Sequence, residues 1–345
     1  MRRMLAAVMA LLALVSLLPC AAAEDTVLSV WQLNRRQTAL LDALYGPLMA
    51  CEEEIALPEG TPYDDVKPVM ETLTTNYPEL LHVDTHYSIT YYQNEPGIAV
   101  AVRPRYRMDA DTAARMRTRM NEAAAALLIE CTTAEEAHDA LLARVTYGGD
   151  GDMRHTAYGA LVQGQATCEG YAKALTLLYR MGGIPCGVVT GTAVRSDGQT
   201  ERHAWNIARL GSLTLIDPTW NDQEAVPGGT HWYYGLSTAQ LSLTHTPDVH
   251  LTVPACTDEA NWHRVRGAVV TEEEGFFRAM QALVTQDQPV NIRITDPALY
   301  GALTADPNQW LEAYNRWCPE GAEFYGGYTW MTEERGMCLM LMRSR

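Results

Sequence analysis

The 345-residue sequence contains no C-x-x-C pair, and its nine histidines do not follow the spacing of metal-ligand motifs. We therefore expect no zinc site, no other metal and no cofactor. Basic residues are also scarce, with 26 Lys and Arg against 42 Asp and Glu, a formal net charge of −16. Phosphates repel an acidic chain, so nucleic acid and anionic membrane surfaces are not expected partners.

Long hydrophobic runs are absent after residue 23, so no later stretch predicts a transmembrane helix. Residues 1–23 have the pattern of a cleavable signal peptide: Arg2 and Arg3 precede an uncharged run, and an A-x-A site lies at 21–23. An uncleaved anchor is the alternative, but the run is shorter than the roughly 20 residues that a span needs. Cleavage leaves 24 basic and 42 acidic residues (24 − 42 = −18) and predicts a secreted or extracytoplasmic protein.

Signal cleavage also leaves seven cysteines. An odd number in a secreted chain indicates at least one free thiol, and Cys168 is the candidate. The other six can form up to three disulfides or none, because spacing alone does not choose a connectivity. These six are Cys51, Cys131, Cys186, Cys256, Cys318 and Cys338. Cys186 lies in an apolar segment, so we expect it to pack as a small hydrophobic residue.

Cys168 opens a segment whose apolar residues recur at helical spacing, which predicts a helix that begins at this cysteine. The apolar face consists of Tyr171, Ala172, Leu175, Leu178 and Tyr179. At a helix N-terminus, unpaired N–H groups and the macrodipole favour the thiolate, which is the nucleophilic form. Gly182 and Gly183 end the predicted helix, and residues 184–194 predict a strand.

Two further predicted strands, 201–209 and 212–220, carry His203 and Asp217. A three-residue hairpin loop places these two side chains directly opposite each other, whereas a two-residue loop places them on opposite faces. The three-residue loop needs a left-handed residue at its end, which Gly211 supplies. We therefore predict the three-residue loop and a contact between the imidazole and the carboxylate.

The short strings around these residues also form a pattern. C-E-G-Y-A at 168–172, H-A-W-N at 203–206 and D-P-T-W at 217–220 resemble, in this order, the core motifs of bacterial transglutaminase-like proteins. These proteins belong to the papain-like cysteine enzyme superfamily. The resemblance covers residues 131–236. It implies the trio of nucleophile, base and orienting acid that cysteine enzymes use.

The resemblance assigns the nucleophile to Cys168, the base to His203 and the orienting acid to Asp217. It also implies an α+β fold with a papain-like, transglutaminase-like core, in which the helix bearing the cysteine packs on an antiparallel sheet bearing the other two residues. The backbone N–H of Cys168 is the expected oxyanion donor, with Gln163 and Gln165 as candidate second donors.

We therefore expect a secreted cysteine enzyme that acts on amide bonds of peptides or proteins through an acyl thioester. It would be a peptidase or deamidase if the acyl group passes to water, which the bacterial relatives favour, or a transglutaminase if it passes to an amine. Cell-wall and cell-surface peptides are candidate substrates. The alternative is a non-catalytic extracellular binding or scaffolding protein built on the same fold.

The expected domains are the signal peptide at 1–23, an N-terminal helix and hairpin region at 24–125, the core at 126–247 and a C-terminal α+β domain at 248–345. N-terminal to the core, the patterns predict helices at 25–56, 63–75 and 111–130, a hairpin turning at 94–97, and a helix opened by a capping box at 133–136. C-terminal to the core, they predict a linker at 245–256, helices at 272–284, 298–303 and 307–317, a strand at 290–295 and a final hairpin. We expect His138 to be structural and the pair His231 and Trp232 to form a packed rim rather than a cleft edge.

Overall fold

The computed structural model describes residues 27–30, 32–223, 226 and 228–344, so the predicted signal peptide lies outside the described residues. The described chain forms two compact units. The first contains the residues up to Val189 together with 206–209 and 249–253, and the second contains 190–205, 210–248 and the residues from Pro254 onward. Within the described chain, no helix combines the length and the apolar character needed to cross a bilayer.

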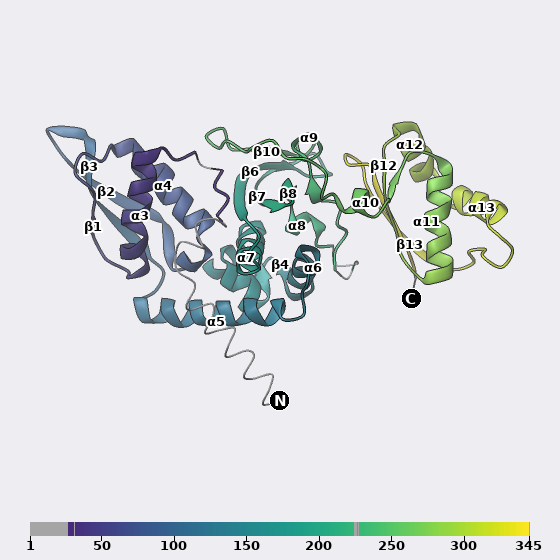
Figure 1. Ribbon diagram of the computed structural model, residues 1–345, viewed down its shortest axis with the longest axis horizontal. Helices are drawn as coiled ribbons and strands as arrows, with labels where there is room; N and C mark the ends of the chain where they lie inside the picture. The colour runs from purple at the N-terminus through teal and green to yellow at the C-terminus, as the bar shows by residue number, and fades with distance from the viewer. Residues whose placement is uncertain (1–26, 31, 224–225, 227, 345) are drawn as a thin grey trace, which may run out of the picture. The chain divides into compact units, whose positions relative to one another are not determined.

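The N-terminal region is a small sheet covered by two helices (Figure 1). Its strands lie in the order β1-β3-β2, with β1 at Ile55–Ala56, β2 at Val83–Tyr92 and β3 at Glu95–Tyr106. Helices α3 (Arg35–Met49) and α4 (Tyr63–Asn76) bury leucine, valine and methionine side chains against these strands. The predicted hairpin is confirmed, although its strands are longer and its turn lies at residues 93–94.

The helix predicted at 25–56 is wrong at both ends. It begins at Arg35 because the side chain of Asn34 accepts hydrogen bonds from the backbone N–H groups of Arg36 and Gln37 and caps the helix. It ends at Met49, and the chain then enters β1. The predicted helix was too long because apolar residues on both sides of α3 continue the helical spacing of its leucines.

Two helices and three short elements lead from this region to the cysteine. Helix α5 (Ala110–Leu128) and helix α6 (Ala134–Arg144) come first, and the predicted capping box of Thr133 and Glu136 is present at the start of α6. The next elements are 3₁₀-helix η2 (Asp152–His155), π-helix η3 (Gly159–Gln163) and strand β5 (Gln165–Ala166), and α7 (Cys168–Met181) follows. All five residues of the predicted apolar face of α7 are fully buried.

The central sheet has five strands in the order β10-β6-β7-β8-β9. These are β6 (Cys186–Val194), β7 (Thr200–Leu210), β8 (Ser212–Ile216), β9 (Tyr234–Leu236) and β10 (His245–Pro247). Gly211, between β7 and β8, has the predicted left-handed backbone, with φ of 80°. β8 is shorter than predicted, because Pro218 cannot continue a sheet ladder and instead begins the short helix α8 (Pro218–Asn221).

The linker predicted at 245–256 is wrong at its start. His245, Thr246 and Pro247 form strand β10, which pairs antiparallel with β6, and His245 lies opposite Ala193. Pro247 is tolerated because β10 is the last strand in the sheet order, at an edge. The two prolines of this segment therefore do not prevent it from forming part of the sheet.

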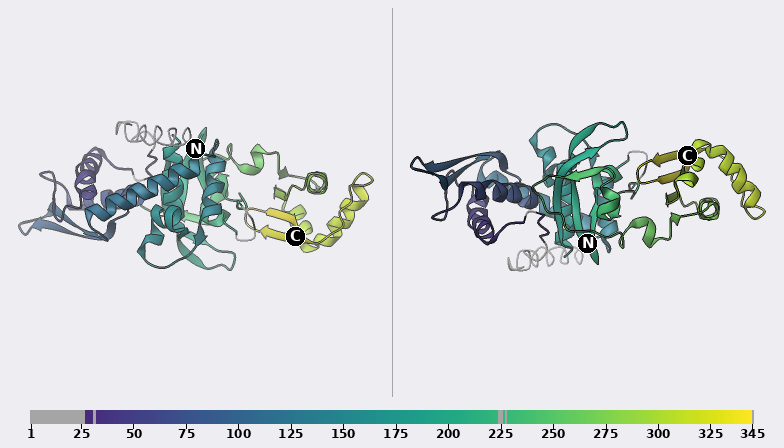
Figure 2. Two further views of the ribbon diagram at one scale, coloured as in Figure 1. Left: turned by 90° about the horizontal axis from the view of Figure 1, so that it is seen from below. Right: turned by 90° about the horizontal axis from the view of Figure 1, so that it is seen from above.

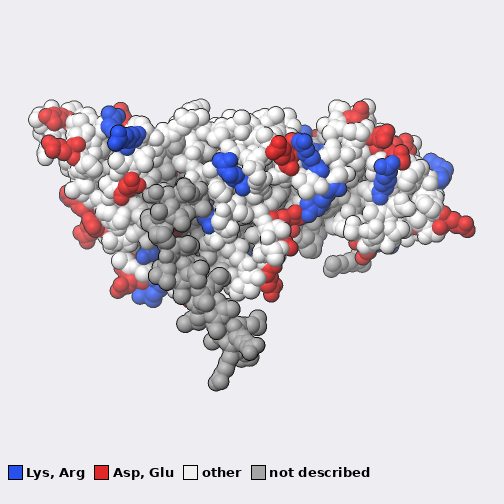
Figure 3. All heavy atoms as spheres, in the orientation of Figure 1, with Lys and Arg blue, Asp and Glu red and all other residues white. Residues whose placement is uncertain are grey.

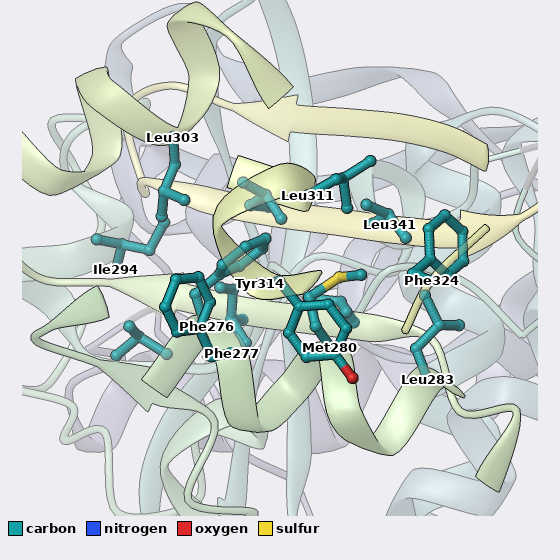
Figure 4. Close-up of a cluster of buried hydrophobic side chains, with 14 residues drawn as sticks. Phe276, Phe277, Met280, Leu283, Ile294, Leu303, Leu311, Tyr314, Phe324 and Leu341 are labelled. Carbon is teal, nitrogen blue, oxygen red and sulfur yellow. The ribbon is translucent and has the colours of Figure 1, made fainter. Parts of the chain in front are cut away.

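The C-terminal region is a second α+β module, as predicted. Its sheet has the order β11-β12-β14-β13, and two further views show β13 and β14 beside the helices of the module (Figure 2). The elements are β11 (Val269–Val270), α11 (Glu273–Gln286), β12 (Val290–Ile294), α12 (Pro297–Ala305), α13 (Pro307–Trp317), β13 (Tyr328–Glu333) and β14 (Cys338–Arg343). Phe276, Phe277, Met280 and Tyr314 fill the space between the helices and the sheet (Figure 4).

All seven cysteines of the described chain are free thiols, so the disulfides that we allowed for are not formed. Cys186 is fully buried, as predicted for a small hydrophobic residue, and burial raises the pKa of its thiol to about 11. Burial likewise raises the pKa of Cys256 and of Cys338 to about 11. These three thiols are structural.

Candidate active site

Cys168 is the first residue of α7, as predicted. Thr167 precedes the helix with an extended backbone, and its hydroxyl lies 2.9 Å from His155 Nδ1 instead of capping α7. The N–H groups of the first turn of a helix have no acceptor within the helix, and they carry its partial positive charge. Cys168 is a partly exposed residue and carries a free thiol.

His203 and Asp217 are in contact, as predicted. His203 lies on β7 and Asp217 directly follows β8, and the Nε2 atom of His203 is 2.8 Å from Oδ2 of Asp217. Both residues are buried. The expectation that Asp217 lies within the strand is wrong, because Asp217 is the N-cap of α8.

The N-cap role orients the carboxylate of Asp217. Its Oδ1 atom accepts hydrogen bonds from the backbone N–H groups of Thr219 at 2.9 Å and Trp220 at 3.1 Å. Oδ2 is thereby directed at His203. The D-P-T-W string thus has a direct structural meaning, because its aspartate caps the helix that its proline begins.

The protonation states of this pair follow from its environment. Burial alone would raise the pKa of Asp217, but hydrogen bonds and charge from His203 and His245 outweigh it and hold this pKa well below its usual range. Asp217 is therefore ionised at neutral pH and only accepts hydrogen bonds. Nε2 of His203 must carry the hydrogen, which makes Nδ1 the nitrogen that would exchange a proton with a thiol.

The sequence analysis missed a second histidine at this carboxylate. His245 Nε2 lies 3.0 Å from Oδ2 of Asp217, the same oxygen that His203 contacts. Trp205 and Trp220 pack their rings against His245, with centroids 4.9 Å and 4.6 Å away. The alternation of threonine and histidine before Pro247 is the sole local sign of a strand here.

Asn206 joins α7 to the strand that carries His203. Its Nδ2 atom donates to the backbone oxygen of Ala172 and to Oγ1 of Thr176, both at 2.9 Å, and the residue is fully buried. Asn206 closes the H-A-W-N string, and the sequence analysis gave it no role. Its hydrogen bonds fasten this part of β7 to the middle of the helix.

A cavity of about 280 Å³ borders the first turn of α7. Charged side chains of both signs line it, among them Asp84, Arg107, Glu169 and Lys173. Lys173 Nζ lies 2.7 Å from Oε1 of Glu169, the residue that follows Cys168. Burial would raise the pKa of Glu169, but the charge of Lys173 outweighs it and lowers this pKa, so the glutamate is ionised.

The other predicted site features have simpler roles. Gln163 closes η3 and Gln165 opens β5, on the segment that leads into α7. His138 is fully buried and its Nδ1 lies 2.8 Å from Asp139. His231 and Trp232 are buried, and His231 stacks on Trp262 with ring centroids 5.0 Å apart, which makes them part of the packing.

Three residues of this site could together bind a metal ion. The ligand atoms of His203, Asp217 and His245 lie within 4.8 Å of one another. Two imidazoles and one carboxylate are a common ligand set for zinc. However, both imidazoles already donate to Asp217, and its other oxygen accepts two backbone N–H groups, so these residues satisfy one another without an ion.

One stretch of the chain matches a known protein family. Residues 114–223 match the family model of the transglutaminase-like superfamily. Two solved structures show low similarity: one of a TGase, at 12% identity and a TM-score of 0.26, and one of a proposed cysteine protease from Cytophaga hutchinsonii, at 13% and 0.25. Each similarity covers 39% of this chain, and 44% and 61% of those chains respectively, which is less than two thirds of their lengths.

The comparison with curated proteins yields no match. The matched residues 114–223 begin in α5, earlier than the resemblance seen in the sequence, and end just after α8. They include all three predicted catalytic residues, Cys168, His203 and Asp217. Residues 114–223 of this chain are therefore a transglutaminase-like domain.

Proposed function

We propose that this protein is a secreted cysteine enzyme that acts on amide bonds of peptides or proteins. It would break the amide bond, hold the acyl group as a thioester and pass that group to water or to an amine. The observation that carries the proposal is the buried contact of 2.8 Å between His203 and Asp217, because an ionised carboxylate that fixes an imidazole tautomer is what a cysteine nucleophile requires. The position of Cys168 at the start of α7 supplies that nucleophile.

Asn206 links β7 to α7. It lies three residues after His203 on β7, and it donates to Ala172, which is one helical turn after Cys168. In the proposed mechanism, the Cys168 proton passes to His203 Nδ1 and the sulfur attacks the substrate carbonyl carbon.

The remaining steps follow from the same groups. The backbone N–H of Cys168 would stabilise the oxyanion that develops. When the C–N bond breaks, the leaving amine takes the proton from His203 and the acyl group stays on sulfur as a thioester. Attack by water, whose proton goes to His203, releases an acid. Attack by a primary amine instead forms a new amide.

Peptide or protein substrates suit the site better than nucleic acid. The cavity lined by Glu169, the residue after Cys168, carries charges of both signs. On the face shown in Figure 3, basic and acidic side chains are interspersed, and no continuous basic surface is visible outside the grey atoms. Cell-wall and cell-surface peptides are the first substrates to test, because the proposed secretion exposes the enzyme to them.

The test is activity profiling of the protein beginning at Glu24 against peptide libraries, with and without an added primary amine. Cleaved or deamidated products indicate hydrolysis, and amine-linked products indicate transfer. The Cys168→Ala variant is the control and should yield neither. If the unmodified protein forms no product and its Cys168 reacts with iodoacetamide no faster than Cys318, the protein is a non-catalytic binding or scaffolding module.

A further inference from the structure

His245 shares the proposed catalytic acid with His203. Its Nε2 lies 3.0 Å from Oδ2 of Asp217, and His203 Nε2 lies 2.8 Å from the same oxygen. Both histidines are buried, with 2% exposure for His245 and 4% for His203. The proposed reaction uses the imidazole of His203 as its base and leaves the imidazole of His245 without an assigned role.

The tautomer of His245 follows from its two neighbours. Asp217 is ionised and only accepts, so Nε2 of His245 carries a hydrogen. Burial lowers the pKa of His245, against the opposing effect of Asp217, so the ring is neutral at neutral pH and its Nδ1 must accept. Thr244 Oγ1, 2.7 Å from Nδ1, is the donor. Its other contact, with the backbone oxygen of Leu241, is longer at 3.3 Å.

The surrounding structure fixes the position of His245. Its backbone pairs with Ala193 in the sheet. Trp205 and Trp220 contact the ring edge to face, and the ring of Tyr233 lies 6.0 Å away. The imidazole cannot turn away from Asp217 without displacing these large side chains, so its hydrogen bond is preorganised.

The carboxylate of Asp217 depends on this donor. The four hydrogen bonds that it accepts come from two backbone N–H groups at Oδ1 and two imidazoles at Oδ2. In a fully buried site, each lost donor favours the neutral carboxyl group over the carboxylate. Loss of the bond to His245 would also remove one of the two donors that hold Oδ2 in place, while the N-cap bonds to Oδ1 would remain.

We propose that His245 is a positioning residue of the active site, which holds Asp217 ionised and aimed at His203. This inference rests on the proposed function of Cys168, His203 and Asp217. His245 itself neither contacts the reacting atoms nor transfers a proton. His245 would influence the thiol only indirectly, through the carboxylate of Asp217 and the imidazole of His203.

The test measures the rate at which iodoacetamide alkylates Cys168 in the folded protein, which requires no known substrate. His245→Phe retains a ring but removes the donor, and we expect alkylation to slow about ten- to a hundredfold. His245→Gln can place its own Nε2 donor near Asp217 and should restore most of the rate. Thr244→Val, which is close in shape and removes the hydroxyl that sets the tautomer, should give an intermediate rate even if the His245 variants fold poorly.

The outcomes separate this inference from the proposed function. If Cys168 of the unmodified protein reacts no faster than the partly exposed Cys318, the proposed function fails. If the unmodified protein reacts rapidly and Asp217→Asn is slow, but His245→Phe and Thr244→Val react like the unmodified protein, the positioning role is overturned. Equal slowing in the folded Phe and Gln variants would also overturn it, because packing alone would then explain the effect.

Discussion

Asn206 and Ala172 join the strand of the proposed base to the helix of the proposed nucleophile, through a hydrogen bond of 2.9 Å from Nδ2 to the backbone oxygen. The asparagine is fully buried and also donates to Thr176. Asn206→Ala should therefore lower the free energy of unfolding by about 2–4 kcal/mol. Urea denaturation measures this loss. Asn121→Ala, on a partly exposed part of α5, should change it by less than about 0.5 kcal/mol.

Cys168→Ser should remove activity with little effect on folding. The residue is partly exposed and the change in volume is small, so we expect the free energy of unfolding to change by less than about 1 kcal/mol. No acyl-enzyme should be detected by intact mass. Cys318→Ser, at another partly exposed free thiol, is the matched control and should retain full activity. A large loss of stability with retained activity would make Cys168 a packing residue.

Asp217→Asn should keep the fold but reduce turnover about 10³- to 10⁴-fold. The amide oxygen can still cap α8, whereas an amide nitrogen facing Nε2 of His203 would favour the wrong tautomer. The measurement compares kcat of this variant with kcat of the control Asp287→Asn, whose side chain is 83% exposed. Normal turnover in Asp217→Asn would remove this residue from the mechanism.

Glu169→Gln should destabilise the protein, because Lys173 would lose its counter-ion. The side chain of Lys173 is only 10% exposed, while that of Glu169 is 35% exposed, so we expect a loss of about 1–3 kcal/mol. The double variant Glu169→Gln with Lys173→Met should recover most of it, because it removes the unpaired buried charge. Thermal or urea unfolding of the two variants measures the difference, and equal stabilities would show that the pair contributes nothing.

His263 should make the C-terminal module sensitive to acid. Burial, with the charge of Arg293 as a further cause, lowers its pKa to about 3. In the unfolded chain His263 binds a proton below about pH 6.5, whereas in the folded chain it stays neutral down to about pH 3. The free energy of unfolding therefore decreases as the pH falls from about 6.5 to about 3. The loss is on the order of a few kcal/mol over this window.

The variant His263→Gln tests this predicted loss of stability at low pH. Glutamine retains a nitrogen that can bond Oδ1 of Asn291, which now lies 3.0 Å from His263 Nε2, but it does not titrate. The urea midpoint of the variant should therefore fall less steeply between pH 6.5 and 4 than that of the unmodified protein. His250→Gln, at an exposed position, should leave the slope unchanged. Parallel slopes for all three proteins would contradict the prediction.

The parts of the site that depend on residues close to one another in the sequence were predictable. Cys168 begins a helix because an apolar pattern and a preceding polar loop mark its start. His203 and Asp217 meet because one short hairpin with a left-handed Gly211 connects their strands. Each of these features is decided within about 15 residues, where turn and helix chemistry act directly.

The missed features depend on contacts between distant segments or on caps that override periodicity. His245 reaches Asp217 only because β10 pairs with β6, more than 50 residues earlier in the chain, and no local pattern encodes that pairing. The start of α3 was misplaced because the cap at Asn34, rather than the leucine spacing, decides where the helix begins. The predicted domain boundaries after residues 23, 125 and 247 stay predictions.

The free thiols of the described chain carry a practical consequence for redox conditions. Since no disulfide contributes to the fold, a reducing agent can protect Cys168 without weakening the protein. Burial raises the pKa of the other six cysteines, which keeps them as poorly reactive thiols. If Cys168 is the nucleophile proposed above, mild oxidants should modify it before the other six and switch off activity reversibly.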